Sequence, residues 1–224
     1  MKKNKILGGA FNFICGLFTA ISIIAISTII TLNIRFIYKF IIEKYNIVNR
    51  TGISSDTLMV NYNKLINYLQ NPFNDKLELP NFPMSSYGQI HFYEVKRIFI
   101  FLMFIGIVFI FFNIIYIIIC RMKNKKIYEF IIIRNFNLGA NILIVFFIIL
   151  ISAYIIDFSK AFVLFHKIFF RNNYWIFDAK TDPIINALPE DLFMIYGAII
   201  LAIVIISSII IKIINKKNAS KSII

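Results

Sequence analysis

Four long apolar runs limit the folds that this sequence can adopt. A membrane-spanning helix needs about 20 mostly apolar residues, because lipid offers no hydrogen-bond partner to the backbone. The runs that meet this requirement cover approximately residues 6–34, 98–120, 138–156 and 192–211. The five prolines all fall between the runs, at Pro72, Pro80, Pro83, Pro183 and Pro189. We therefore predict an all-α membrane protein with four unbroken transmembrane helices.

The composition agrees with a chain that is solvated mainly by lipid. Of the 224 residues, 59% are hydrophobic and 16% are charged, whereas an average soluble domain has roughly 25% charged residues. We interpret residues 1–224 as a single membrane domain. Its two longer connecting segments, residues 35–97 and 157–191, would lie outside the membrane on the same side, because each is followed by one of the even-numbered spans.

The basic residues predict the orientation of the chain. Half of the 24 lysines and arginines lie before the first run, in the loop after the second run and in the C-terminal tail, where the only acidic residue is Glu129. Cytoplasmic loops of membrane proteins are enriched in this way. We therefore expect a multi-pass protein of the plasma membrane with both termini in the cytoplasm. The net charge of +13 follows from this pattern, so no nucleic-acid partner is expected.

The first external segment has the signals of a small helical cap. Thr51 to Asp56 reads as a turn followed by a helix N-cap, and Leu58, Leu65 and Leu69 recur at helical spacing after it. A segment of this length is too short for an independent globular domain. The predicted fold class is therefore four transmembrane helices with a small helical external cap.

The second external segment is rich in aromatic residues, for which two interpretations remain open. Rings at a membrane surface commonly form an interfacial belt. Alternatively, some of them wall a groove for a lipid chain, and the candidates for this groove are Phe162, Phe165, Phe169 and Trp175.

The two histidines are the main candidates for chemistry. His91 precedes the second run and His166 follows the third, so both are expected at the external membrane surface. Histidine accepts and releases protons near neutral pH, and a converging pair would make an acid–base site. The alternative is two unrelated interfacial histidines.

Two carboxylates could support such a site. Glu94 lies three residues after His91 on the same helix face, and Asp157 lies at the end of the third run. Each has the alternative interpretation of a plain interfacial charge. Two histidines without a nearby cysteine leave a structural zinc site short of ligands, so we expect no metal and no cofactor.

Three stretches of the sequence resemble a known family. They are TGISSDTLMVNYNKLINYL (residues 51–69), FPMSSYGQIHFYEVKRIF (82–99) and FHKIFFRNNYWIFDAKTDPIINALPEDLF (165–193). Together they resemble a bacterial family of four-helix integral membrane proteins that includes the lipoprotein intramolecular transacylases. Members of known activity tend to carry an acidic residue shortly before the histidine and Asp at the position of Glu94, whereas here Gly88 and Gln89 precede His91.

The resemblance implies an acyltransferase that acts on diacylglyceryl-modified lipoproteins at the external membrane face. It implies that an acyl chain moves from the glycerol to the amino group of the N-terminal cysteine, and the family's paired histidines match His91 and His166. The substrate amine is then the nucleophile, so no serine or cysteine nucleophile is required. The expected partners are diacylglyceryl lipoproteins and membrane lipid.

Three other functions are compatible with parts of the sequence. A non-catalytic lipid-binding or assembly protein would need the aromatic groove without the histidines. A channel or carrier would need ionisable residues deep in the runs, where this chain has only asparagines and small hydroxyls. A serine hydrolase would use Ser85 or Ser86 with His91, but the sequence lacks the nucleophile-elbow motif.

Overall fold

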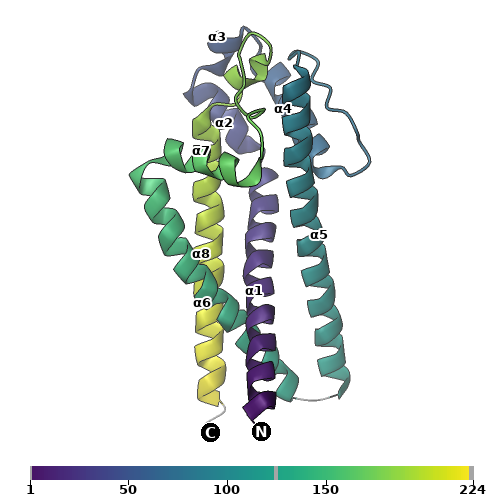
Figure 1. The fold of residues 1–224 in the computed structure, drawn as a ribbon, viewed down its shortest axis with the longest axis vertical. Coiled ribbons are helices and arrows are strands. Elements are labelled where there is room, and N and C mark those ends of the chain that lie inside the picture. The colour runs from purple at the N-terminus through teal and green to yellow at the C-terminus, as the bar shows by residue number, and fades with distance from the viewer. Residues whose placement is uncertain (1, 124–125, 222–224) are drawn as a thin grey trace. The chain divides into compact units, whose positions relative to one another are not determined.

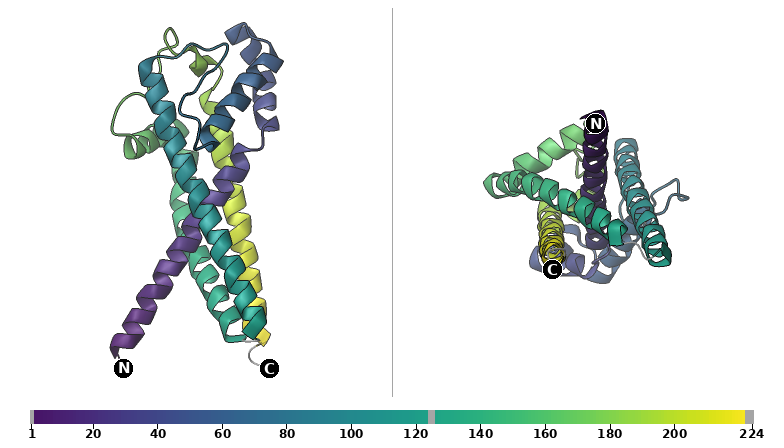
Figure 2. Two further views of the ribbon diagram at one scale, coloured as in Figure 1. Left: turned by 90° about the vertical axis from the view of Figure 1, so that its right-hand side faces the viewer. Right: turned by 90° about the horizontal axis from the view of Figure 1, so that it is seen from below.

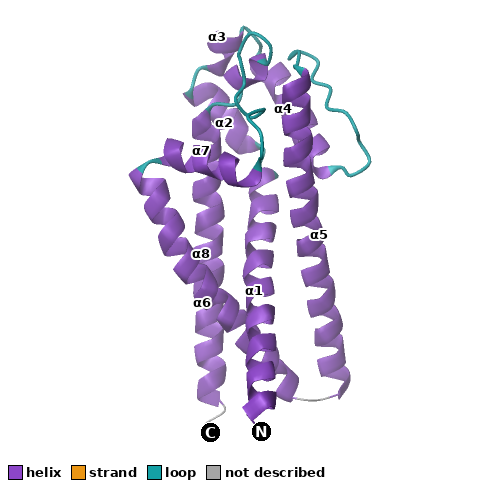
Figure 3. Cartoon of the chain, viewed as in Figure 1, coloured by secondary structure: helices purple, strands orange, loops and turns teal. Residues whose placement is uncertain are grey.

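Every regular element in the described part of the chain is a helix (Figure 3). The structure is a computed structural model, and it describes residues 2–123 and 126–221. In chain order the elements are α1 (Lys2–Leu32), α2 (Phe36–Lys44), α3 (Ile47–Thr51), α4 (Ser55–Gln70), α5 (Ser86–Lys123), α6 (Lys126–Ile156), α7 (Phe158–Phe169), the 3₁₀ helix η1 (Pro183–Asn186) and α8 (Glu190–Lys221). Figure 1 labels the α-helices, and Figure 2 shows them from two further directions.

Four of these helices are long and apolar enough to cross a membrane. The candidate spans are Gly9–Leu32 in α1, Ser86–Ile119 in α5, Ile133–Ile156 in α6 and Glu190–Asn218 in α8. The prediction of an all-α protein with four membrane helices is confirmed. The predicted single membrane domain and its external segments stay predictions.

The second long helix begins earlier than the apolar run indicated. The run starts near residue 98, but α5 begins at Ser86 and continues for 38 residues. At about 1.5 Å per residue, α5 is roughly 57 Å long, whereas the hydrocarbon core of a bilayer is about 30 Å thick. Part of α5 must therefore lie outside the hydrocarbon core, and His91 lies within its first two turns.

The chain folds into two compact units, each built from segments that are distant in the sequence. The first unit contains Met1–Thr28, Phe104–Ser152 and Ile199–Ile224, and the second contains Ile29–Met103 and Ala153–Ala198. Within the first unit, the start of α1 and the end of α8 lie at the same end (Figure 1).

The first unit is held together by a small apolar core and a close helix contact. Its core contains Ala20 and Ile23 of α1, Leu143 of α6 and Val204 of α8. A Cβ atom added at Gly16 would lie 2.8 Å from Cβ of Leu138, so α1 and α6 approach closely at this point. Small residues permit such contacts between helices in lipid, where packing replaces the hydrophobic effect as the source of association.

In the second unit, α4 forms around the predicted turn and cap. Gly52 adopts a left-handed conformation with φ of 70°, which a residue without Cβ takes at little cost. The Ser54 hydroxyl accepts a hydrogen bond from the backbone N–H of Thr57, and so caps the helix. Leu58, Leu65 and Leu69 are buried.

A cluster of buried tyrosines joins α4 to two other elements of this unit. Tyr62 of α4 stacks on Tyr38 of α2, with ring centroids 4.0 Å apart, and shares a hydrogen bond between hydroxyls with Tyr196 of α8. The Tyr38 hydroxyl donates to the carbonyl of Ala187 over 2.9 Å. Burial raises the pKa of both Tyr38 and Tyr62, so these hydroxyls stay protonated.

Two hydrogen bonds hold the connection between α4 and α5 against one face of α5. Gln89 donates to the carbonyl of Leu77 over 3.0 Å, and the Lys96 ammonium donates to the carbonyl of Asn74. Residues seven apart share a helix face, whereas residues two or five positions after Gln89, such as His91 and Glu94, are rotated by about 140–160° around the helix. His91 and Glu94 are therefore turned away from this connection.

The close contact at Gly16 can be tested by enlarging the side chain. Gly16→Leu should lower the midpoint of thermal unfolding of the detergent-purified protein, because the new side chain would have to push α1 away from Leu138. Gly9→Leu is the matched control, since a Cβ atom at Gly9 meets nothing within 4 Å. An equal midpoint in the two variants would contradict the described packing of α1 on α6.

Candidate active site

The N-terminal turn of α5 is fixed by two capping contacts. The Ser85 hydroxyl accepts from the backbone N–H of Gly88 over 3.0 Å, and a carboxylate oxygen of the buried Asp182 accepts from the N–H of Ser85 over 2.8 Å. Asp182 comes so close to Gly88 that a Cβ atom there would clash with its carboxylate. These contacts set the position of His91, one turn further along α5, and occupy Ser85 as a cap.

Helix α7 positions His166. Asp157 precedes this helix, and its carboxylate accepts from the backbone N–H of Lys160 over 2.9 Å and forms an ion pair with the Lys160 ammonium over 2.9 Å. These two contacts lower the pKa of Asp157. The polar contacts of Asp157 are therefore within α7 and not with an imidazole. Its predicted supporting role stays a prediction.

The structure brings the two imidazoles together. The ring centroids of His91 and His166 are 5.9 Å apart, and their planes are inclined by 35°. Both side chains are buried, with 7% and 8% of their surface exposed. The two residues are far apart in the sequence, so the fold of this unit creates the pair.

Aromatic rings surround both imidazoles. Trp175 stacks on His166 with centroids 4.7 Å apart, while Phe170 contacts His91 edge-to-face at 4.8 Å. The other rings in contact are Phe162 at 4.3 Å and Phe165 at 5.5 Å from His166, and Phe177 at 5.5 Å and Phe92 at 5.9 Å from His91. This arrangement, which we call the aromatic cage, keeps both imidazoles in a weakly polar environment.

Of the four residues predicted to line a lipid groove, three contact His166 directly. The fourth, Phe169, packs on Phe165 at 4.6 Å and is about half exposed. Phe170 and Phe177 were not predicted from the sequence as neighbours of His91. Both lie in the aromatic segment, but α7 ends at Phe169, so helical spacing could not show that the extended chain after it returns to His91.

The tautomer of His166 follows from its hydrogen bond. Its Nδ1 lies 2.7 Å from the carbonyl oxygen of Phe162, and a carbonyl can only accept. Nδ1 therefore carries the proton, and in the neutral ring Nε2 holds the free lone pair. Burial lowers the pKa of His166, and the hydrogen bond to Phe162 partly opposes this change. A lowered pKa keeps the ring neutral at pH 7, where it can accept a proton.

Glu94 is joined to the aromatic cage by Asn172. The side-chain amide of Asn172 donates to Oε1 of Glu94 over 2.8 Å, and the backbone carbonyl of Asn172 accepts from the Trp175 indole over 3.1 Å. Two further side-chain atoms on this face of α5, Nδ1 of His91 and Oε2 of Glu94, are buried without a hydrogen-bond partner among the described residues. Such an atom typically costs about 1–3 kcal/mol. Sequence patterns gave no signal for Asn172.

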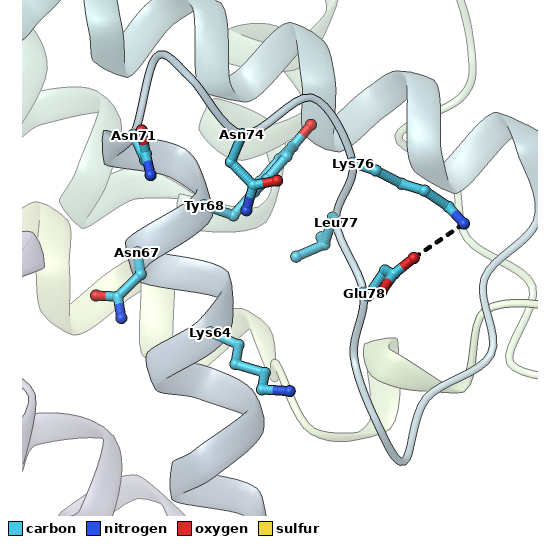
Figure 4. Close-up of a pocket in the computed structure, with 8 residues that line it drawn as sticks. All are labelled: Lys64, Asn67, Tyr68, Asn71, Asn74, Lys76, Leu77 and Glu78. Atoms are coloured by element: carbon cyan, nitrogen blue, oxygen red, sulfur yellow. Dashed lines mark ion pairs between the residues drawn. The ribbon is translucent and has the colours of Figure 1, made fainter.

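Two cavities in the second unit lie beside other residues. One has a volume of about 450 Å³ and lies between the C-terminal half of α4 and the connection to α5, where Lys76 forms an ion pair with Glu78 (Figure 4). The other, of about 530 Å³, is lined by α7 residues and their N-cap, from Asp157 to Lys167. Neither is lined by an imidazole, so cavity volume does not identify this site. In the described ranges, no three His, Cys, Asp or Glu side chains gather to hold a metal ion.

Comparison with known proteins identifies the family. The family model of the lipoprotein intramolecular transacylase Lit matches residues 13–193, which is most of the chain. This chain belongs to the lipoprotein intramolecular transacylase family. The family identifies it as an enzyme of the acyltransferase class, as the sequence predicted, and its four apolar helices make it a multi-pass membrane protein.

Solved structures agree with this family. The chain is similar to the in meso structure of the membrane-integral lipoprotein intramolecular transacylase Lit from Bacillus cereus, with 32% identity, a TM-score of 0.79, and coverage of 96% of this chain and 98% of the other. Two structures of that transacylase with one histidine replaced also match. The arginine variant has 31% identity, a TM-score of 0.73, and coverage of 99% and 97%. The alanine variant has 32% identity, a TM-score of 0.73, and coverage of 98% of both chains. A search of curated proteins found no match.

The environment of His166 can be tested by NMR, because a chain with two histidines gives two imidazole signals. In histidine-labelled protein, the pKa of His166 should lie below the ordinary value of about 6.5. Trp175→Ala should raise it toward that value, because loss of the stacked ring admits water. Tyr174→Ala is the matched control, since Tyr174 stacks on Tyr87. Titration of wild-type His166 at or above 6.5 would contradict the described burial.

Proposed function

We propose that this enzyme moves an acyl chain from the diacylglyceryl group of a lipoprotein to the amino group of its N-terminal cysteine, with His91 and His166 as the acid–base pair. The observation that carries the proposal is the contact of two buried imidazoles, 5.9 Å apart, in the aromatic cage. Membership of the transacylase family supports the reaction and the substrate class. The structure of the relative from Bacillus cereus supports the membrane setting.

The chemistry needs proton transfer more than it needs a nucleophile from the enzyme. The amine of the substrate attacks the ester carbonyl, so one imidazole removes a proton from nitrogen and a protonated donor supplies one to the departing glycerol oxygen. A free lone pair on Nε2 of His166 and its lowered pKa suit the accepting role. Because amine and ester belong to one molecule, their effective concentration is high once the cage holds them.

The remaining predicted residues would act around this pair. Phe162, Phe165, Phe169 and Trp175 would wall the acyl chain, and the exposed rings of Phe165 and Phe169 offer an apolar surface to lipid. Glu94 would support the pair from α5, and Asp157 would support it by fixing the start of α7. Membrane lipid is the expected surrounding of the lipoprotein substrate.

We further propose that the histidines face the outside of the plasma membrane and that both termini face the cytoplasm. The basic residues before the first span and after the fourth favour this orientation. The start of α1 and the end of α8 lie at one end of the first unit, which supports placing them on one side of the membrane (Figure 1).

The reaction itself gives a test by mass spectrometry of lipopeptides. In bacteria that make diacylglyceryl lipoproteins and lack other N-acylating enzymes, expression of this protein should leave the lipopeptide mass unchanged while its amine becomes blocked and carries the acyl group. Acylation from a phospholipid would add a chain, and hydrolysis would remove one. His91→Ala and His166→Ala should each lower the rate by about 10²–10⁴-fold. If the pair acts as one unit, the double variant should be scarcely slower than either single variant.

An exposed lysine of the same unit provides the control for these variants. Lys180 is exposed in the connection after the aromatic cage, so Lys180→Ala should keep the wild-type rate. A free amine despite confirmed expression, or full activity in both single histidine variants, would refute the proposed reaction.

The orientation can be tested by labelling introduced cysteines in intact cells. Cysteines in place of the exposed Asp56 and Lys180 should react with a membrane-impermeant thiol reagent, and one in place of the exposed Lys216 should react only after permeabilisation. Asn124, in the predicted inner loop, lies outside the described residues, so Lys216 represents the inner side. Labelling of the Lys216 variant in intact cells would reverse the orientation.

A further inference from the structure

A series of contacts connects the carboxylate of Glu94 to both histidines. Along α5, Glu94 lies one turn after His91. Its Oε1 accepts from Asn172, the carbonyl of Asn172 accepts from Trp175, and Trp175 stacks on His166. His166 in turn faces His91 at 5.9 Å. The series thus ends at His91, one turn before Glu94 on the same helix, so Glu94 belongs to the same site as both imidazoles.

The two oxygens of Glu94 have different surroundings. Oε1 is held by the amide of Asn172 at 2.8 Å, whereas Oε2 is buried and has no hydrogen-bond partner among the described residues. The ion pairs of the described residues join Lys76 to Glu78 and Lys160 to Asp157, and neither includes Glu94. A buried carboxylate oxygen without a partner is costly, so a site that keeps one has an acceptor ready for a donor, preferably a cationic one.

The reaction brings a cation to this place. The α-amino group of a peptide has an ordinary pKa of about 7.7–8.0, so the free amine of a diacylglyceryl cysteine arrives mainly as an ammonium at pH 7. A charge-assisted hydrogen bond to a carboxylate is stronger than one between neutral groups. We propose that Oε2 of Glu94 binds the ammonium of the substrate, while Asn172 holds the carboxylate in position through Oε1. This inference rests on the proposed function, because that function defines the substrate.

In this proposal, each group has one role in binding the ammonium or in moving its protons. Glu94 binds the ammonium beside the imidazoles, and a neutral imidazole takes its proton, which frees the lone pair for attack. The transfer forms the amide N–C bond and breaks the ester C–O bond. The nitrogen loses two protons in total: one reaches the departing glycerol oxygen, and the other passes through imidazole to water. Glu94 is thus a binding residue and Asn172 a positioning residue.

Substrate entry has to uncover the two buried histidines and the buried Oε2 of Glu94. Asn172 and Trp175 lie in the connection between α7 and η1, which contains no helix or strand. A shift of this connection would open the imidazoles and Oε2 at once, so the burial of Oε2 is compatible with binding.

The test is a binding measurement with probes that cannot react. The probes are two dialkylglyceryl-cysteine peptides with ether links in place of esters, one with a free amine and one with hydrogen in place of the amine. Full-length wild-type protein should bind the free-amine probe at least about tenfold more tightly than the second, deamino probe. Glu94→Gln should abolish this preference and leave the affinity for the deamino probe unchanged. Glu94→Asp should keep part of the preference for the free-amine probe, and Asn172→Ala should reduce that preference.

Glu78→Gln is the matched control, because Glu78 is an exposed glutamate paired with Lys76 outside the histidine site; it should keep the full preference. Equal binding of the two probes by wild type would overturn the proposal, as would an undiminished preference in folded Glu94→Gln protein. If that variant fails to fold, an undiminished preference in both Glu94→Asp and Asn172→Ala would overturn it. Since ether probes undergo no transfer, these results are independent of whether the acyl-transfer assay succeeds.

Discussion

The contact between the buried rings of His91 and His166 is the interaction on which the proposed function depends. Neither helix alone could form it. The first turn of α5 is held by the Ser85 and Asp182 caps, and α7 is started by the Asp157 cap. Rings from α7 and from the connection after it then close around the imidazoles. The capped helix ends thus fix backbone positions, and the aromatic cage fixes the side chains.

The aromatic cage fits the proposed reaction, in which two imidazoles transfer protons and the enzyme supplies no nucleophile. An apolar surrounding disfavours the charged form of His166 and leaves it as a neutral base, and the hydrogen bond to Phe162 determines which nitrogen accepts the proton. Burial of Oε2 of Glu94 likewise strengthens its attraction to an ammonium. In the proposed mechanism Glu94 and the histidines have complementary roles, since the carboxylate would attract the charged amine and the imidazole would remove the charge.

The fold could be predicted from the sequence where a local pattern determines the structure. The apolar runs indicated four membrane helices, and the signals from Gly52 to Leu69 indicated the turn, cap and buried face of α4. Helix ends were less predictable, because α5 and α6 extend into segments whose polar residues do not interrupt a helix. The same limit explains why Phe169 was selected and Phe170 was not: α7 ends between them.

The site was predictable only as far as residue chemistry and family resemblance reach. Two histidines at one membrane surface, in segments resembling a transacylase family, indicated the pair, but periodicity along separate helices cannot give the distance between them. Asn172 was missed because its importance comes from tertiary contacts with Glu94 and Trp175. The stretch Arg-Asn-Asn-Tyr-Trp that contains Asn172 has no distinctive pattern of its own.

The central claim is that this site holds one lipopeptide and transfers protons while the acyl chain moves within that molecule. An isotopic crossover measurement tests it most directly. The purified enzyme would receive a mixture of two diacylglyceryl lipopeptides, one with deuterated acyl chains and the other with a ¹³C-labelled peptide. The account predicts that every N-acylated product carries only the labels of its own precursor. Products that combine deuterated chains with the ¹³C peptide would contradict it, because the acyl chain would then have passed between molecules.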